Sequence, residues 1–201
     1  HGVEPSPIYP ACYLSEAREI LGAIDPEAID RLAYALASVH HAGGRLFCLG
    51  LGGSAAHASH AAADFRKTCG FEAYCPTDHV AAVTAYANDG GFETALAAWL
   101  QGCRLGRSDA LLVFSTSGKS PALLGAVAHA LNVRARVFAI LGADGGEIAR
   151  AIPPWHGLVL PLRYPARMTP HVEGLMAVLW HCLVSHPALK TREFAWEARQ
   201  T

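Results

Sequence analysis

The sequence predicts an α/β fold: a doubly wound, mostly parallel five-stranded sheet flanked by helices. Short apolar runs alternate with stretches of helical periodicity along most of the chain. Two of these runs, 45–49 and 110–114, pass through a short turn rich in glycine or hydroxyl groups directly into a helix, as parallel βαβ units do. The length of 201 residues and the hydrophobic share of 52% suit one domain with a sizeable buried core.

The expected elements follow this pattern in order. Two amphipathic helices precede the first strand, at 13–21 and 26–41, with Asp25 as the N-cap of the second. The other elements are strands at 45–49, 110–114, 136–141 and 157–162, short strand candidates at 71–75 and 80–85, and helices at 54–69, 92–103, 121–131, 146–151 and 172–185. We divide the single domain, 1–201, into an N-terminal helical segment (1–42), an α/β core (43–185) and a peripheral polar tail (186–201).

Composition excludes several classes of protein. The formal net charge is -1 and the pI is about 6.9, so the sequence offers no basic surface for nucleic acid or an anionic membrane. No apolar run reaches the length that a bilayer span needs. The six cysteines are scattered without a CxxC spacing, which indicates free thiols in a reducing compartment. We therefore expect a cytoplasmic protein without a signal peptide, and its high apolar content suggests that other subunits cover some surface.

The segment Phe114-Ser-Thr-Ser-Gly-Lys-Ser-Pro121 is the first candidate for a binding site. Ser120 can cap the following helix and Pro121 can open it, so free N–H groups, the helix dipole and the hydroxyls would all favour a phosphate. On this segment alone, an ordinary strand–helix turn with capping hydroxyls explains the sequence equally well.

A second segment favours the phosphate interpretation. Gly50-Leu-Gly-Gly-Ser54 repeats the same arrangement of strand, glycine turn, hydroxyl and helix. Two such turns in one parallel sheet meet at its carboxyl edge and can form two sides of one phosphate-ester site. Neither turn has the spacing of a P-loop or of GxGxxG, so a nucleotide is not the expected ligand.

These motifs resemble the SIS (sugar isomerase) domain, through Gly50-x-Gly-Gly-Ser-Ala and Ser115-Thr-Ser-Gly-x-Ser. Within that family the chain is similar to the phosphoheptose isomerases, with further matching segments at Ala87-Asn-Asp-Gly-Gly-Phe-Glu93, at Leu141-Gly-Ala-Asp-Gly-Gly-Glu-Ile-Ala and at His60/Asp64 with Glu173 and His181. The resemblance spans about 14–183. It implies a flavodoxin-like sheet and a homotetramer whose N-terminal helices pack between subunits, with the sites near subunit interfaces.

A metal site is the third candidate. His57, His60 and Asp64 share one helix face, and His60 with Asp64 at i, i+4 could chelate a cation; a solvated face with a His–Asp hydrogen bond is the alternative. The resemblance implies one zinc ion per subunit on His60, Asp64, Glu173 and His181. Glu173 and His181 lie roughly 12 Å apart along a straight helix, which is stretched for one ion. From its apolar surroundings alone, His181 reads as a core histidine.

The resemblance also implies the chemistry, an aldose–ketose isomerisation of sedoheptulose 7-phosphate through an enediol, with Asp64 and His181 as the proton-transfer pair. The implied substrate contacts are Gly53, Ser54, Asn88, Asp89, Ser115, Thr116, Ser117 and Ser120. Asn88 and Asp89 are expected on a loop after a strand, where Asn-Asp-Gly-Gly is also simply good turn chemistry. Leu51 and Lys119 stand where the family usually has Asn. The alternative function is a non-catalytic SIS module that binds a sugar phosphate or a protein, of the replication-initiator-adaptor type.

Overall fold

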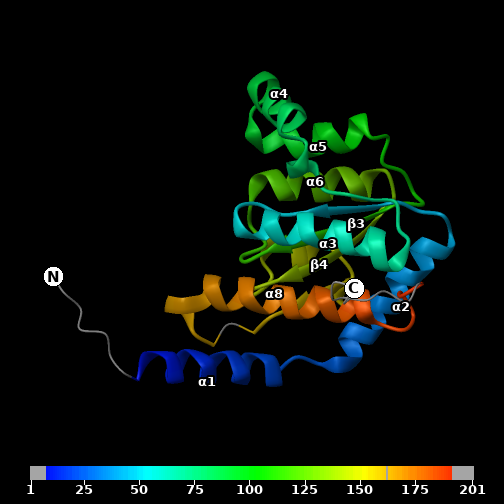
Figure 1. The fold of residues 1–201 in the computed structure, drawn as a ribbon. Helices are drawn as coiled ribbons and strands as arrows, with labels where there is room; N and C mark the ends of the chain where they lie inside the picture. The colour runs from blue at the N-terminus through cyan, green and yellow to red at the C-terminus, as the bar shows by residue number, and fades with distance from the viewer. Residues whose placement is uncertain (1–7, 162, 192–201) are drawn as a thin grey trace, which may run out of the picture.

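The structure is a computed structural model that describes residues 8–161 and 163–191. Within them, five parallel strands form one sheet in the order β2-β1-β3-β4-β5 (Figure 1). The strands are β1 (Leu46–Leu49), β2 (Ala73–Tyr74), β3 (Ala110–Ser115), β4 (Arg136–Leu141) and β5 (Gly157–Val159). The predicted doubly wound parallel sheet is confirmed, and its order reverses between β1 and β3, where open sheets of this kind bind ligands.

Helices cover both faces of the sheet, so the central strands are apolar on both sides. On one face, β-strand residues such as Leu46 and Leu112 pack into a core with α1 (Tyr9–Gly22), α2 (Pro26–His41), α3 (Gly53–Cys69) and α8 (Met168–Ser185). On the other face, alternate residues such as Phe47 and Val113 pack against α5 (Phe92–Gly102), α6 (Pro121–Asn132) and α7 (Gly146–Ala151). Short 3-10 turns occur at Pro76–Asp78, Pro154–His156 and Pro165–Arg167. None of the helices within the described ranges has the length and apolar content to cross a membrane.

The strand candidate at 80–85 is wrong, because this segment is part of helix α4 (Val80–Gly90). Its valines and threonine suggested a strand, but its alanines favour a helix. α4 contains no buried residue, whereas a strand inside a two-sided parallel sheet would be buried. It lies at the edge of the molecule beyond α5 (Figure 1). The last strand is also shorter than expected: β5 ends at Val159, and residue 162 lies outside the described residues.

Polar contacts attach α1 to the beginning of α8. Glu16 accepts hydrogen bonds from Arg167 and contacts Nε2 of the buried His171 at 2.8 Å. The hydrogen bonds from Arg167 lower the pKa of Glu16 to about 2, and His171 contributes in the same direction. The ring of Tyr13 stacks on His171 with 4.2 Å between ring centroids. The N-terminal helix is therefore attached to the helix that carries Glu173 and His181.

The first part of the tail is attached to the core as well. Leu189 is 2% exposed and belongs to the core cluster under α2 and α8. The backbone N–H of Thr191 donates to the carbonyl of Thr68, and His186 contacts Asp30 at 3.0 Å. Residues 192–201 of the predicted peripheral tail lie outside the described residues.

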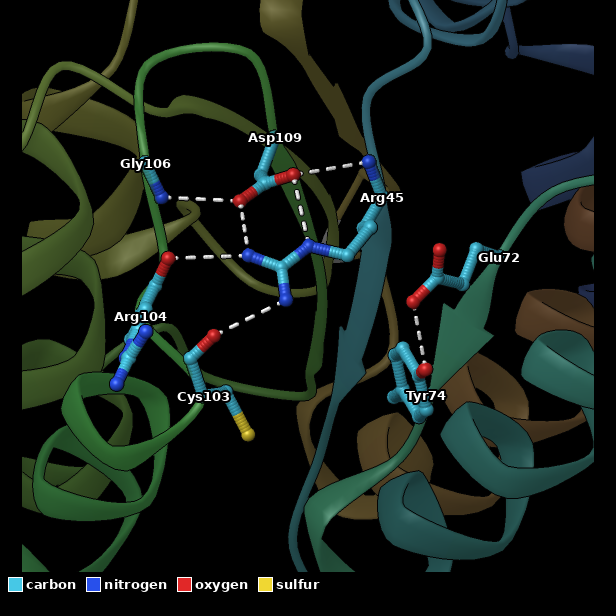
Figure 2. Close-up of polar contacts among 7 residues, drawn as sticks. All are labelled: Arg45, Glu72, Tyr74, Cys103, Arg104, Gly106 and Asp109. Carbon is cyan, nitrogen blue, oxygen red and sulfur yellow. Dashed lines mark hydrogen bonds and ion pairs between the residues drawn. The ribbon is translucent and has the colours of Figure 1, made fainter.

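A charged cluster lies at the amino end of the sheet, directly before β1 and β3 (Figure 2). Asp109 accepts hydrogen bonds from the backbone and side chain of Arg45 and from the N–H of Gly106. The remaining guanidinium hydrogen bonds go to the carbonyls of Cys103 and Arg104, each at 3.0 Å. The cluster fixes the starts of both strands whose opposite ends lead into the predicted phosphate turns.

Candidate active site

The two predicted phosphate turns line one cavity at the carboxyl ends of β1 and β3. The cavity measures about 130 Å³, and its walls include Ser54, Ser115, Thr116, Ser117, Ser120 and Glu173. This is several times the space that one water molecule needs but below the ~300–1,000 Å³ of a complete small-molecule pocket. It can therefore take a phosphate group, while the rest of a sugar would extend beyond it.

Some of these hydroxyls are already used inside the protein. Ser115 accepts a hydrogen bond from the N–H of Gly118 at 3.0 Å, and Ser54 lies 3.9 Å from the sulfur of Met176. The hydroxyls of Thr116, Ser117 and Ser120 have no hydrogen-bond partner in the part of the chain that is described. Ser120 occupies the N-cap of α6 without making a capping bond, so three hydroxyls and the start of a helix remain available to an anion.

The serine turn is held in place by the turn before α7. Gly118 has a φ of +63°, and a Cβ there would lie 2.0 Å from the carbonyl oxygen of Gly145. The carbonyl of Gly118 in turn accepts from the N–H of Ile148 at 3.1 Å. Lys119 extends from this turn to Asp144, 3.9 Å away, and both side chains are more than half exposed. The serine turn is thus packed closely against the turn before α7, and the charge of Lys119 is directed at Asp144.

The side chain of Glu173, from α8, lies against the beginning of α3. A Cβ on Gly53 would be only 2.5 and 2.6 Å from the two carboxylate oxygens of Glu173, so glycine makes room for this side chain. A carboxylate is favoured at a helix N-terminus, where backbone N–H groups are unpaired. Glu173 belongs to the regular helix α8, and its carboxylate is directed to the cavity.

His60, Asp64 and His181 form a cluster between α3 and α8. The Nε2 atoms of His60 and His181 lie 3.6 and 3.9 Å from Oδ2 of Asp64, and the three ligand atoms all lie within 4.8 Å of one another. Donors on a tetrahedral zinc ion are about 3.3 Å apart when each bond is 2.0–2.1 Å long. The cluster can therefore hold a cation after small side-chain movements. Glu173 is not part of this close group.

Two details suit this cluster to a cation. Oδ2 of Asp64 is buried and has no hydrogen-bond partner among the described residues, although a buried carboxylate oxygen is costly to leave unpaired. Nδ1 of His181 contacts the carbonyl of Ala177 at 2.8 Å. Because a carbonyl only accepts, Nδ1 donates in this contact, and Nε2 is the ring nitrogen on the side of Asp64 that a cation can reach. The side chains present fit a divalent cation.

His57 interacts electrostatically with residues of both halves of the site. It is half-buried, and burial lowers its pKa below the ordinary value. The charge of Glu173 opposes that shift, whereas His60 and His181 add to it. His57 is thus within electrostatic range of both the carboxylate at the cavity and the cluster. The sequence spacing predicted that His57 shares a helix face with His60 and Asp64, but it indicated no function for His57.

The interpretation of Asn88 and Asp89 as loop residues after a strand is wrong. Both are exposed at the end of α4, where the Asn88 amide donates to the Asp89 carboxylate at 3.2 Å. Neither side chain lines the cavity of the serine turn. Leu51, noted in the sequence because the family usually has Asn there, lines the cavity. Leu123, another apolar wall, was not predicted, because a side chain without polar atoms leaves no chemical signature in a sequence.

Comparison with known proteins identifies the family. The SIS domain model matches residues 12–142. The chain is 32% identical over 174 residues to the phosphoheptose isomerase of Methylococcus capsulatus, covering 84% of this chain and 85% of the relative. The chain belongs to the SIS domain family and, within it, to the phosphoheptose isomerases. The predictions of this family and of an enzyme of this type are confirmed.

A solved structure and a second relative add to this finding. The phosphoheptose isomerase of Francisella tularensis superposes with a TM-score of 0.80 at 26% identity, covering 94% of this chain and all of the other. The DnaA initiator-associating protein DiaA of Escherichia coli O1:K1 / APEC is 30% identical over 184 residues, covering 86% of this chain and 90% of the relative. The fold is shared by an enzyme and by a protein named for a binding role, so the residues of the site must distinguish the two functions.

Proposed function

We propose that this chain is a metal-dependent isomerase that interconverts sedoheptulose 7-phosphate and D-glycero-D-manno-heptose 7-phosphate. The cluster of His60, Asp64 and His181, with its unpaired carboxylate oxygen, is the observation that supports this most strongly. A purely binding module has no need for such a group. The family and the relatives named phosphoheptose isomerase support the choice of substrate.

The phosphate is assigned to the serine-lined cavity. Thr116, Ser117 and Ser120 offer free hydroxyls at the start of α6, and the helix dipole favours the anion there. Ser54 and Ser115 complete the walls of the cavity, and Gly53, at the start of α3, is proposed as a further substrate contact. Because Glu173 already places a carboxylate against the start of α3, the phosphate is expected on the α6 side, away from that negative charge.

The reacting carbons are assigned to the cluster. In an open-chain heptose phosphate, the carbonyl end and the phosphate lie at opposite ends of the carbon chain, and the two halves of the site are likewise separated along α3 and α8. Asp64 and His181 exchange the proton between the two carbons that become aldehyde and ketone. The Ala177 carbonyl accepts from Nδ1 of His181, so Nε2 is the one nitrogen of this ring that can meet either the cation or the substrate proton.

Zinc is the proposed metal, one ion per subunit. His60, Asp64 and His181 would hold it, and Glu173 would join them only if its side chain turns away from Gly53. Imidazole and carboxylate donors suit zinc. When bound, the ion would polarise the substrate carbonyl and stabilise the negative charge of the enediolate.

The assembly is proposed to be a cytoplasmic homotetramer with its sites near subunit contacts. All six cysteines are free, in keeping with a reducing compartment. Helix α4 buries none of its residues within its own chain. We propose that α4 packs on a second subunit and that Asn88 and Asp89 contact the sugar of that subunit's site, since within one chain they do not line the serine cavity.

The second candidate function is a non-catalytic module that binds a sugar phosphate or a protein. The similarity to the DnaA initiator-associating protein supports it. The deciding experiment measures the metal content of the purified protein and its isomerase activity on sedoheptulose 7-phosphate before and after chelation. Stoichiometric zinc and activity that the chelator removes would support the isomerase. A protein without metal and without turnover would favour the binding module.

A further inference from the structure

One indole ring contacts both histidines of the cluster. Trp180 lies in α8 directly before His181, and the two rings stack with 3.5 Å between centroids and 28° between planes. His60, from α3, lies edge-on to the same indole, with 4.6 Å between ring centroids and 63° between ring planes. Neighbouring residues of a helix do not normally face each other, so this contact is a feature of the fold and not of the sequence spacing.

The indole is itself fixed by the core. Trp180 is 1% exposed and belongs to the cluster that packs α3 and α8 on the sheet. Its Nε1–H is buried and has no hydrogen-bond partner in the described ranges. An aliphatic side chain would fill apolar space here without an unpaired donor. What the aliphatic residue could not supply is a flat, rigid face for the two imidazoles.

His60 depends on this face more than His181 does. His181 is oriented independently by the hydrogen bond from Nδ1 to Ala177. The His60 side chain is 60% exposed, and its only polar contact within the described residues is the 3.6 Å approach to Asp64. Without the indole, the exposed ring of His60 could rotate away, and ordering it again would cost conformational entropy when a cation binds.

We propose that Trp180 is a positioning residue of the cation site, which orients His60 beside the separately anchored His181 so that both Nε2 atoms face Oδ2 of Asp64. The proposal rests on the cation-binding part of the proposed function and on no step of the reaction. It predicts that the cation affinity depends on an aromatic ring at position 180 and that the fluorescence of this indole reports on binding.

The test compares Trp180→Leu and Trp180→Phe with the unchanged protein. Zn²⁺ affinity is measured by calorimetry, and Co²⁺ titration is followed by tryptophan fluorescence, because Co²⁺ quenches an indole nearby. Trp180→Leu should bind Zn²⁺ about 10–100-fold more weakly, as is typical when a group supporting a ligand is removed. Trp180→Phe should keep the affinity within about threefold, since a ring remains, and should lose most of the Co²⁺ quenching. Trp99→Phe, in the core on the other sheet face, is the matched control and should change neither.

Three results would overturn the proposal. Unchanged Zn²⁺ affinity in folded Trp180→Leu would show that the indole does not position the ligands. Co²⁺ quenching that persists in Trp180→Phe would show that another tryptophan lies next to the cation; this readout holds even if Trp180→Leu fails to fold. If the unchanged protein binds neither ion, the proposed metal site fails together with the inference, which distinguishes that result from the first two.

Discussion

Two buried aspartates of this protein differ in how their carboxylates are hydrogen-bonded. Asp109, at the amino end of the sheet, accepts hydrogen bonds to both carboxylate oxygens and pairs with Arg45 (Figure 2). Asp64, between α3 and α8, is equally inaccessible, yet its Oδ2 has no hydrogen bond and faces two histidines. Asp109 is 6% exposed and Asp64 is 7% exposed, so burial does not explain why only Asp109 is fully hydrogen-bonded.

The difference indicates what each aspartate does. A buried carboxylate that is fully hydrogen-bonded stabilises the fold, and its removal leaves other groups unpaired. A buried carboxylate with a free oxygen is costly for stability, and it is available for a cation or a proton. Substitutions of the two aspartates test this contrast, and two substitutions in the serine turn test the other half of the site, in order of decreasing expected effect.

The largest effect is expected for Asp64→Asn. It should reduce turnover of sedoheptulose 7-phosphate by about 10²–10⁴-fold, because an amide can neither take up the proton nor bind the cation as a carboxylate does. The free energy of unfolding in the absence of metal should change by less than about 1 kcal/mol, since no hydrogen bond to Oδ2 is lost. Steady-state kinetics and urea unfolding measure the two quantities. A fully active variant would contradict the role assigned to Asp64.

Asp109→Asn should have the reverse pattern. The free energy of unfolding should fall by about 2–4 kcal/mol, somewhat below the cost of breaking a fully buried pair, because the Arg45 side chain is 27% exposed. The kcat of the folded fraction should stay within about twofold of the unchanged protein, because Asp109 is hydrogen-bonded to Arg45 and Gly106 and not to the proton-transfer groups, whose loss has far larger effects. A large loss of kcat without a loss of stability would remove the contrast between the two aspartates.

The pH dependence of stability tests the same cluster. Burial raises the pKa of Asp109, but the hydrogen bonds from Arg45 and Gly106 outweigh it, so the pKa lies below the ordinary value. A carboxyl group whose pKa is lowered by folding stabilises the protein above its unfolded pKa of about 3.9 and loses that contribution as the pH falls through the folded pKa. The stability difference between the unchanged protein and Asp109→Asn should therefore be constant at neutral pH and shrink in acid.

Ser117→Ala is expected to act on binding alone. Loss of one free hydroxyl in the serine cavity should weaken sugar-phosphate binding by about 1–3 kcal/mol, or roughly 5–150-fold in Kd. Ser185→Ala, at the exposed end of α8, is the matched control. Calorimetric titration of both variants with the sugar phosphate is the measurement. An unchanged Kd for Ser117→Ala would remove this turn from the site.

The smallest effect is expected for Lys119→Met. Lys119 pairs with Asp144 at 3.9 Å in an exposed position, so the midpoint of urea unfolding should not shift measurably. Because the lysine is directed at Asp144 and not at the cavity, the Kd for the sugar phosphate should also stay within about threefold. Loss of a charged hydrogen bond to the phosphate would weaken binding by more than that. A larger loss of affinity, screened by salt, would assign Lys119 to the phosphate.

Most of the sheet could be predicted because its signals are local. The run at 110–114 is apolar throughout and the run at 136–141 is apolar after Arg136, as two-sided burial requires, and they correspond to β3 and β4. Asp25 caps α2 through the N–H of Glu27, as predicted. The error at 80–85 has a physical cause: valine and threonine favour strands, alanine favours helices, and only burial decides between them.

The sequence by itself determined the parallel sheet, the two turns at its switch point and the shared helix face of His60 and Asp64, because each depends on neighbours a few residues apart. The tertiary structure alone decided that His181 meets Asp64, that Glu173 lies against Gly53, and that one indole contacts two histidines. Those contacts depend on how α8 packs along α3, and the register of two packed helices is set by side-chain packing, which local periodicity does not encode.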